Sequence, residues 1–262
     1  MRSDALPKTE SPSRVLTAEQ RSVFFERGWI VCRQLFSVVE LDTLRRCFDA
    51  LADRAPEQDE TIEGARFVVH NGAIQRVVWC GGAQRELLSV GRDPRILRRV
   101  ADLLGSQQMD HLINQAHFKL PGDGVHFDWH QDSERRRYGT DLWTDVNGVG
   151  SYVQSVLAID DCRLDNGPIR LIPGNPGHLG LGDKSVEERA RYIREERAES
   201  AIMAAGSVLF FGPYTIHGSE PNRSQRARRV LINGYAAPGA NRRPYPGSGL
   251  GIRIDSRGAI SH

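Results

Sequence analysis

Lysine is scarce in this sequence. Lys8, Lys119 and Lys184 are its lysines, so nearly all of the 35 basic residues are arginines. These arginines are spread along the chain and are matched by 33 acidic residues, for a formal net charge of +2. Proteins that bind nucleic acid through their charge usually carry a basic face or stripe, which is not evident here. We therefore expect no nucleic-acid partner.

Long apolar runs are also missing. No run approaches the roughly 18 residues that a transmembrane helix requires. The N-terminal stretch MRSDALPKTESPSR is polar and has no apolar segment of the kind found in a signal peptide. The sequence therefore predicts a protein without a membrane segment, and a cytoplasmic location follows by default.

Cysteine is the third scarce residue. The chain has four, Cys32, Cys47, Cys80 and Cys162, and no two of them form a Cys-x-x-Cys pair. Such isolated cysteines do not provide a disulfide framework, and in a cytosolic protein they are usually reduced. Free thiols are the expected state.

The length and composition indicate one folded domain. A chain of 262 residues with 39% hydrophobic and 26% charged residues is ordinary for a globular protein with a large core. Residues 1–14 are rich in serine, proline and charge, and we expect them to be disordered. A single domain over 15–262 follows, and its Pro- and Gly-rich end, after about residue 237, resembles a loop or lid.

The N-terminal part predicts a helix, a strand and a second helix. Thr17–Gln20 has the Ser/Thr-x-x-Glu/Gln form of a capping box, which predicts a helix over about 18–27 that Gly28 ends. The apolar stretch 29–32 is typical of a short strand. A second capping box at Ser37–Glu40 predicts the next helix.

The middle of the chain combines a hairpin with two helices. Residues 66–80 form two β-like runs around Asn71-Gly72, a strong hairpin signal. Residues 86–104 have helical apolar spacing, and Pro94 within them is expected to separate two short helices.

From about residue 110 onward, short β-like runs alternate with Gly, Pro and Asp/Asn turns, and helical composition returns only at 185–199. This pattern favours a double-sheet jelly roll. The predicted fold is mainly β with flanking helices, built on a double-stranded β-helix (jelly-roll, cupin-like) core.

The sequence His130-Gln131-Asp132 offers a candidate metal site. Side chains two residues apart point to the same face of a strand, so the imidazole and the carboxylate can bind one ion. A later strand-and-turn stretch contains His217, and Arg228 begins the strand after it. Two histidines and one carboxylate form the facial triad of non-haem iron(II) oxygenases, which leaves positions open for cosubstrate and oxygen.

Two alternatives compete for this site. His126-Phe127-Asp128 is a second His-x-Asp with the same parity, so local geometry leaves both pairs open. His126 and His130 also have the spacing of zinc proteases, but the Glu after the first His is absent and the context is poor for a helix. The remaining histidines are interpreted as ordinary surface or core residues: His70, His111, His117, His178 and His262.

Four segments together resemble one enzyme family. They are TAEQRSVFFERGWIVCRQLFS near the N-terminus, the Lys-x-Pro-Gly to Trp-His-Gln-Asp run at 119–132, LAIDDCRLDNGPIRLIPGNPGH at 157–178, and the stretch from His217 to Arg228. Their order and spacing, over roughly residues 15 to 237, resemble the phytanoyl-CoA dioxygenase family of iron(II)- and 2-oxoglutarate-dependent oxygenases, which includes bacterial ectoine hydroxylases.

The resemblance implies a ligand set and a reaction. His130, Asp132 and His217 match the family's iron ligands, and Arg228 matches the arginine that binds the distal carboxylate of 2-oxoglutarate. The implied cofactors are Fe(II), 2-oxoglutarate as cosubstrate and O2. The implied reaction hydroxylates, or otherwise oxidises, an unactivated C–H bond of a small-molecule substrate and releases succinate and CO2.

Other residues are candidates for contacts with cosubstrate or substrate. Gln115 and Gln154 are candidates for binding 2-oxoglutarate, and Arg135–Arg137 for receiving an anionic substrate, although such arginine runs are commonly solvated. The loop 173–178 departs from the family's Pro-Gly-Ser-His, which we expect to alter a turn. Residues that shape the substrate site in relatives, or pack in the core, are Arg76, Trp79, Trp129, Tyr138 and Trp143.

A non-catalytic alternative stays open. A cupin-like protein that binds a metal or a small molecule, or senses it, would share the fold without turnover. An intact triad together with Arg228 disfavours this reading, because a pure binder has no need of all four side chains. The sequence leaves the substrate and the oligomeric state open.

Overall fold

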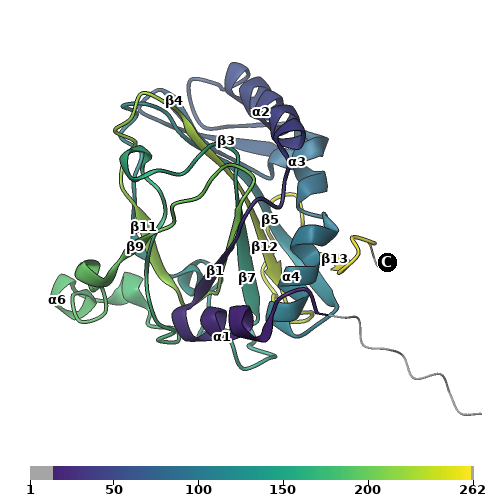
Figure 1. Ribbon diagram of the computed structural model, residues 1–262, viewed down its shortest axis with the longest axis vertical. Coiled ribbons are helices and arrows are strands. Elements are labelled where there is room, and N and C mark those ends of the chain that lie inside the picture. Colours follow the sequence, from purple (N-terminus) through teal and green to yellow (C-terminus); the bar gives the residue numbers. More distant parts are fainter. Residues whose placement is uncertain (1–13, 261–262) are drawn as a thin grey trace, which may run out of the picture.

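The computed structural model describes residues 14–260, drawn in Figure 1. The prediction of disorder over 1–14 therefore falls outside the described residues, apart from Arg14, and so does His262. The α-helices are α1 (Ala18–Arg27), α2 (Val38–Asp53), α3 (Arg85–Val90), α4 (Pro94–Leu104), α5 (Asp132–Arg135) and α6 (Val186–Arg189). Short 3-10 helices are η1 (Cys80–Gly82), η2 (Leu164–Asn166), η3 (Leu181–Asp183) and η4 (Glu195–Arg197).

The strands make two antiparallel sheets. They are β1 (Trp29–Cys32), β2 (Glu60–Ile62), β3 (Ala65–His70), β4 (Ala73–Val78), β5 (Gln108–Lys119), β6 (Phe127–His130), β7 (Tyr152–Ala158), β8 (Arg170–Ile172), β9 (Glu199–Ser200), β10 (Val208–Phe211), β11 (Ile216–Ser219), β12 (Arg228–Ala236) and β13 (Ile252–Asp255). The major sheet has nine strands in the order β1-β10-β7-β12-β5-β4-β3-β2, with β13 also on β5. The minor sheet has four strands in the order β6-β11-β8-β9.

The major sheet is buried on both faces. Its inner face packs against the minor sheet through a cluster that joins Val156, Phe211, Val230 and Ile232 to Leu171 of β8. Its outer face packs against α2, α3 and α4, which lie along one side of the molecule in Figure 1. Two facing antiparallel sheets flanked by helices confirm the predicted jelly-roll, cupin-like fold.

Local signals place the entry helices as predicted. Thr17 and Ser37 each accept the N3 backbone N–H, while the N3 side chain bonds back to the cap, so both capping boxes form. Such a cap stabilises a helix by about 1 kcal/mol. Gly28 ends α1 with φ 96°, a conformation that costs glycine little. Pro94 is at the first turn of α4 and separates it from α3.

The hairpin signal is also confirmed. β3 and β4 pair around Asn71 and Gly72, which have φ of 51° and 74°. Positive φ at both central residues is what a tight I′ turn requires, and Asn-Gly tolerates it well. This hairpin extends the major sheet beyond β5.

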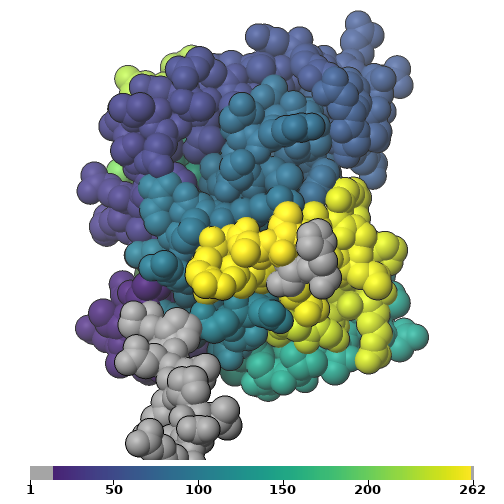
Figure 2. Space-filling model, turned by 90° about the vertical axis from the view of Figure 1, so that its right-hand side faces the viewer, coloured from purple at the N-terminus to yellow at the C-terminus, as the bar shows by residue number. Residues whose placement is uncertain are grey.

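Two later segments differ from the sequence expectation. Helical composition at 185–199 yields only the single turn of α6 and the 3-10 turn η4, neither of which has a buried residue; of this stretch, Ile193 and Ala198 pack, partly buried, against a small core cluster. The segment after residue 237, expected as a loop or lid, contains β13, which pairs with β5. Gly258 lies so close to the Arg92 carbonyl that a Cβ would overlap it, and Figure 2 shows this yellow segment lying over the surface beside α4.

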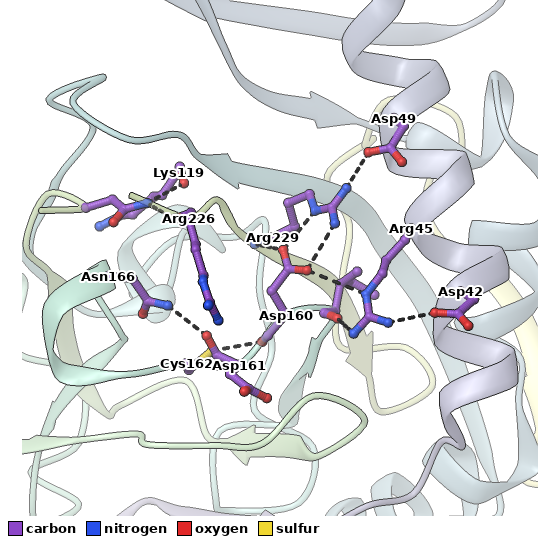
Figure 3. Close-up of polar contacts among 12 residues, drawn as sticks. Asp42, Arg45, Asp49, Lys119, Asp160, Asp161, Cys162, Asn166, Arg226 and Arg229 are labelled. Atoms are coloured by element: carbon purple, nitrogen blue, oxygen red, sulfur yellow. Dashed lines mark hydrogen bonds and ion pairs between the residues drawn. The ribbon is translucent and has the colours of Figure 1, made fainter. Parts of the chain in front are cut away.

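Charged side chains tie α2 to the end of the sheet. Arg229 of β12 forms ion pairs with Asp160 (2.8 Å) and with Asp49 of α2 (2.5 Å). Arg45 of α2 lies 3.6 Å from Asp160 and 2.8 Å from Asp42. Figure 3 shows these contacts as one continuous network between the helix and the strand.

The predicted thiol state and the absence of a membrane segment can both be compared with the structure. All four cysteines are free and buried. Among the described residues, none of the helices has the length and apolar character of a membrane span.

Candidate metal centre

The three predicted ligands lie together between the two sheets. One donor atom from each of His130, Asp132 and His217 lies within 4.8 Å of the others. His130 ends β6 and stands directly opposite His217 on β11, with ring centroids 4.3 Å apart. Strand pairing between β6 and β11 therefore joins residues that are far apart in the sequence.

Asp132 reaches this position from a helical turn. The sequence argument placed the His-x-Asp pair on one strand, but β6 ends at His130 and Asp132 begins α5. Gln131 between them is still extended, with φ −114° and ψ 142°, so side-chain alternation continues through it. The Ser133 N–H donates to the Pro213 carbonyl (2.9 Å) and holds the start of the turn.

Gln131 fixes the backbone from the opposite side. It is fully buried, and its amide donates to the carbonyls of Gly177 (2.9 Å) and Tyr214 (2.6 Å) and accepts from the Leu179 N–H (2.9 Å). In the sequence, Gln131 stands between two candidate ligands, and no role was predicted for it. Alternation alone would have shown that it points away from the ligands and toward the loop after β8.

The hydrogen bonds of the two imidazoles favour metal binding through Nε2. The Nδ1–H of His130 donates to the Asp128 carbonyl (2.7 Å), and that of His217 donates to the Thr215 carbonyl (2.9 Å). Burial, helped by neighbouring His217, lowers the pKa of His130 to about 4, so its ring is neutral at physiological pH. A neutral imidazole with a fixed Nδ1–H presents Nε2 as a metal ligand.

The carboxylate of Asp132 also fits a cation. Its Oδ2 is buried and has no hydrogen-bond partner among the described residues. A buried carboxylate oxygen without a donor is costly unless a cation neutralises it. The donor set, two imidazole nitrogens and one carboxylate, is that of a non-haem iron site.

The competing pair lies elsewhere. The side chains of His126 and Asp128 are 58% and 89% exposed, and they face each other at 3.8 Å. Among residues 14–260, the group of side chains placed to hold a metal ion includes neither His126 nor Asp128. The strand at β6 also removes the helical context that zinc-protease spacing would need.

Arg228 is the first residue of β12, on the inner face of the major sheet. It is 4% exposed and pairs in register with Lys119 of β5. Its Nη2 donates to the Gly167 carbonyl (2.6 Å), while its Nε has no partner among the described residues. Burial lowers its pKa, yet a guanidinium stays charged in proteins. An anion is therefore the missing partner.

Two bases beside Arg228, the buried Lys119 and the half-buried His117, were not predicted as site residues. Lys119 is 1% exposed and donates to Ser219 Oγ (2.8 Å) and to the Glu220 carbonyl, and burial followed by the charge of Arg228 lowers its pKa to about 7. His117 lies on the same face, where burial keeps its pKa well below the usual value. Alternation from Gln115 along β5 is the signal that would have indicated both.

The two glutamine candidates lie on the same inner face. Gln115 Oε1 accepts from His117 Nε2 (2.9 Å), and it pairs in register with Ile232. Gln154 of β7 is 6% exposed, and its Oε1 accepts from the Tyr152 hydroxyl (2.8 Å). Their positions are compatible with cosubstrate contacts, which remain a prediction.

Trp129 does not face the metal site. It is adjacent to His130 on β6, so alternation directs it to the outer face of the minor sheet, where it packs against Ile172, Leu181 and Ile216. The expectation that it shapes the substrate site is therefore wrong.

The other predicted aromatic residues fall into two places. Tyr138 stacks on Trp143 with centroids 4.9 Å apart, in a cluster that also contains Tyr152. Trp79 lies 5.8 Å from the His111 ring, and a Cβ on Gly247 would overlap it. Both are packing positions.

The remaining predicted arginine is Arg76, on β4. It pairs in register with His117, so it lies beside the inner-face bases.

The loop that departs from the family pattern supports the site. Gly177 provides the carbonyl that Gln131 binds, and His178 Nδ1 lies 2.8 Å from Ser133 Oγ. The displaced histidine thus hydrogen-bonds to the residue after Asp132. Its effect is larger than the change of turn that the sequence argument expected.

Comparison with known proteins identifies the family. The family model "Phytanoyl-CoA dioxygenase (PhyH)" matches residues 24–230. Ectoine dioxygenase from Halomonas elongata is 23% identical over 251 residues, which cover 87% of this chain and 72% of that protein. L-Proline trans-4-hydroxylase from Streptomyces griseoviridis is 22% identical over 238 residues, covering 79% and 82%.

Solved structures show the same fold. EctD from S. alaskensis in its apoform has a TM-score of 0.76 at 20% identity, over 90% of this chain and 83% of that one. The same protein with 2-oxoglutarate and 5-hydroxyectoine has a TM-score of 0.70 at 20% identity, covering 87% and 78%. The predicted enzyme class, a non-haem dioxygenase that depends on Fe(II), 2-oxoglutarate and O2, is confirmed. With its model matched over most of the sequence, this chain belongs to the phytanoyl-CoA dioxygenase (PhyH) family.

Proposed function

We propose that His130, Asp132 and His217 bind Fe(II), that Arg228 binds the distal carboxylate of 2-oxoglutarate, and that the enzyme oxidises a C–H bond of a small molecule. The observation that carries the proposal is the convergence of three ligand groups, whose donor atoms lie within 4.8 Å of one another, with Asp132 Oδ2 buried and without a partner among the described residues. Succinate and CO2 are the expected coproducts. A cytoplasmic location and the absence of a nucleic-acid partner, both expected from the sequence, belong to the same proposal.

The metal and cosubstrate, when bound, supply the oxidising chemistry. The chain holds its ligands ready for them. The carbonyls of Asp128 and Thr215 fix the ring orientation of His130 and His217, so no rotamer has to be selected on binding. The Phe211 ring lies against the His217 ring at a tilt of 55°, with centroids 4.6 Å apart, and packs this ligand on the core side.

Arg228 is suited to a carboxylate. A guanidinium presents a planar fork that matches the two carboxylate oxygens, which the ammonium of a lysine does not. The Nε of Arg228, which has no hydrogen-bond partner among the described residues, can donate one of the two hydrogen bonds of such a contact. Lys119, next to it in register, donates to Ser219 and the Glu220 carbonyl and leaves Arg228 as the available fork.

Asp132 also bears on the outcome of the reaction. A halogenating enzyme of this type leaves the carboxylate position free for a halide ion. The buried carboxylate of Asp132 therefore supports hydroxylation, or a related oxidation such as desaturation or ring closure.

The test is the visible charge-transfer band that forms when Fe(II) and 2-oxoglutarate are added without oxygen. We expect the band in the native protein and its loss in Asp132→Ala, with Asp128→Ala as the matched control that keeps it. A folded native protein without the band would refute the proposal. A band without succinate formation in air, across a broad set of small molecules, would favour the non-catalytic binding or sensor protein.

A further inference from the structure

Arg136 is a buried cation without an acidic partner. It is 7% exposed and lies one turn after Asp132, whose carbonyl accepts its backbone N–H (3.1 Å). Among residues 14–260, the arginine–carboxylate ion pairs are made by other arginines. A buried charge that the chain leaves unpaired is strongly unfavourable, so an external anion is the natural partner.

The side chains in direct contact with Arg136 are uncharged and leave donors free, while the Asp132 carboxylate acts on it through its charge without forming an ion pair. Its Nη2 donates to the Tyr152 hydroxyl (3.0 Å), and its guanidinium lies over the rings of Tyr152 (4.8 Å) and Tyr245 (5.4 Å). Its Nε and the Tyr245 hydroxyl are both buried with no hydrogen-bond partner among the described residues. Both groups therefore keep a free donor, and the oxygens of a carboxylate or a phosphonate are suitable acceptors for them.

Arg136 and Arg228 serve different ends of the site. Arg228 begins β12, whereas Arg136 contacts Tyr152, which pairs with Ala236 at the last position of that strand. The Tyr152 hydroxyl that Arg136 contacts lies against Gly234, and the length of strand from Gly234 to Arg228 separates the two arginine contacts by roughly 20 Å. The five-carbon chain of 2-oxoglutarate is too short to reach both arginines. An anion at Arg136 therefore belongs to a second molecule.

The surroundings of Arg136 are positively charged. Arg243 also lies over the Tyr245 ring (5.4 Å), and its Nη1 donates to the Arg135 carbonyl (2.8 Å). The loop after Asp132 and the C-terminal segment thus present their arginines together. The positive potential of these arginines attracts an approaching anion before it reaches the buried guanidinium of Arg136.

We propose that Arg136, with Tyr245, binds an anionic group of the primary substrate, so that the substrate is a carboxylate- or phosphonate-type small molecule. This inference rests on the proposed function, because it takes Asp132 as a metal ligand and Arg228 as the 2-oxoglutarate site. Arg136 is then a specificity-determining residue on the substrate side of the metal.

The experiment uses protein loaded with Fe(II) and saturating 2-oxoglutarate under nitrogen, which keeps Arg228 occupied. Acetate, methylphosphonate and inorganic phosphate are titrated separately at constant ionic strength, and the charge-transfer band is recorded. We expect at least one anion to shift the band saturably, with a Kd at least tenfold weaker in Arg136→Gln. Arg137→Gln, an exposed neighbour, is the matched control and should bind as the native protein does.

Tyr245→Phe provides a second variant that keeps the ring and removes one donor, with an expected loss of threefold or more in the same Kd. Unchanged anion binding in both variants, or no saturable shift with any of the three anions in the native protein, would overturn the inference. The charge-transfer band recorded before any anion is added distinguishes failure of the Arg136 site from failure of the proposed function. If it forms and anions have no effect, only the Arg136 site fails; if it never forms, the proposed function fails as well.

Discussion

Arg228 and Arg229 are neighbours on β12, yet they have opposite surroundings. Arg229 points to the outer face, where Asp160 and Asp49 pair with it (Figure 3). Arg228 points to the inner face, where it is 4% exposed and its Nε has no partner among the described residues. Arg229 is satisfied by the chain, whereas Arg228 keeps an unpaired donor, as its proposed contact with 2-oxoglutarate requires.

The same contrast extends over the two faces of the major sheet. On the outer face, Asn114 donates to Asn233 Oδ1 (2.9 Å), and the atoms Asn233 Nδ2 and Ser155 Oγ, which have no partner among the described residues, belong to uncharged side chains. On the metal side, Asp132 Oδ2 and Arg136 Nε lack partners among the described residues. We infer that outer-face changes act mainly on stability, whereas inner-face changes act mainly on ligand binding.

The largest expected effect is on the inner face, at Arg228. Arg228→Gln should raise the KM for 2-oxoglutarate about 100-fold, since loss of a buried charge pair costs about 3 kcal/mol of binding free energy. The free energy of unfolding without ligands should not fall, because an unpaired buried charge is removed. Steady-state kinetics and urea unfolding check both parts. An unchanged KM would remove Arg228 from the 2-oxoglutarate site.

A second prediction concerns His111, on the outer side. Its Nε2–H donates to the Ile113 carbonyl (2.8 Å) and to Asn233 Oδ1 (3.1 Å), while its Nδ1 is buried without a partner among the described residues. Burial lowers its pKa to about 4. Between pH 6.5 and 4 the unfolded chain therefore binds a proton that the folded chain does not, and stability falls with falling pH.

The full contribution of this group is about 3 kcal/mol, lost between neutral pH and pH 4. Urea unfolding at pH 7 and pH 4.5 should show a smaller loss of stability in His111→Gln than in the native protein. Parallel pH dependences for the two proteins would contradict the assignment. Unchanged turnover of His111→Gln at pH 7 would agree with an outer-face role.

Arg229→Ala is the counterpart of the Arg228 variant. Removing it breaks the pairs to Asp160 and Asp49, of which Asp49 is well exposed, so we expect a loss of about 1–2 kcal/mol in the free energy of unfolding. The KM for 2-oxoglutarate should stay unchanged. A large change in KM with intact stability would show that the two faces are not separate in the way we describe.

Local signals explain how much of the fold was predictable. Capping boxes at Thr17 and Ser37 and the turn at Asn71-Gly72 determine nearby backbone through a few hydrogen bonds and positive φ values, so the sequence predicts them directly. β13 was missed because Ile252–Asp255 is short, and its hydrogen bonds come from pairing with distant β5. Tertiary contact, not propensity, makes it a strand.

The candidate site likewise contains residues that the sequence indicated and one, Arg136, that it did not single out. The residue types and spacing indicated a metal site, but only the family resemblance selected His130 and Asp132 over His126 and Asp128 and assigned a role to Arg228. Arg136 was only one of three adjacent arginines in the sequence. Its burial depends on Tyr152 and Tyr245, which come from two other segments, and no local pattern indicates that. The lack of an ion-pair partner for Arg136 can be recognised only when the positions of all its neighbouring side chains are known.

The smallest expected effect is at the start of α2, in the helices that cover the outer face of the major sheet. Ser37→Ala removes the side-chain acceptor of the Glu40 N–H (3.4 Å) and half of the capping box, while Glu40 also keeps its pair to Arg95 (2.6 Å). The free energy of unfolding should fall by about 1 kcal/mol, with the KM for 2-oxoglutarate unchanged. Thermal unfolding of Ser37→Ala beside Ser37→Asp, which restores an acceptor, checks this. If Ser37→Ala altered the charge-transfer band, the helical layer would be coupled to the metal side, and the separation of the two faces would have to be abandoned.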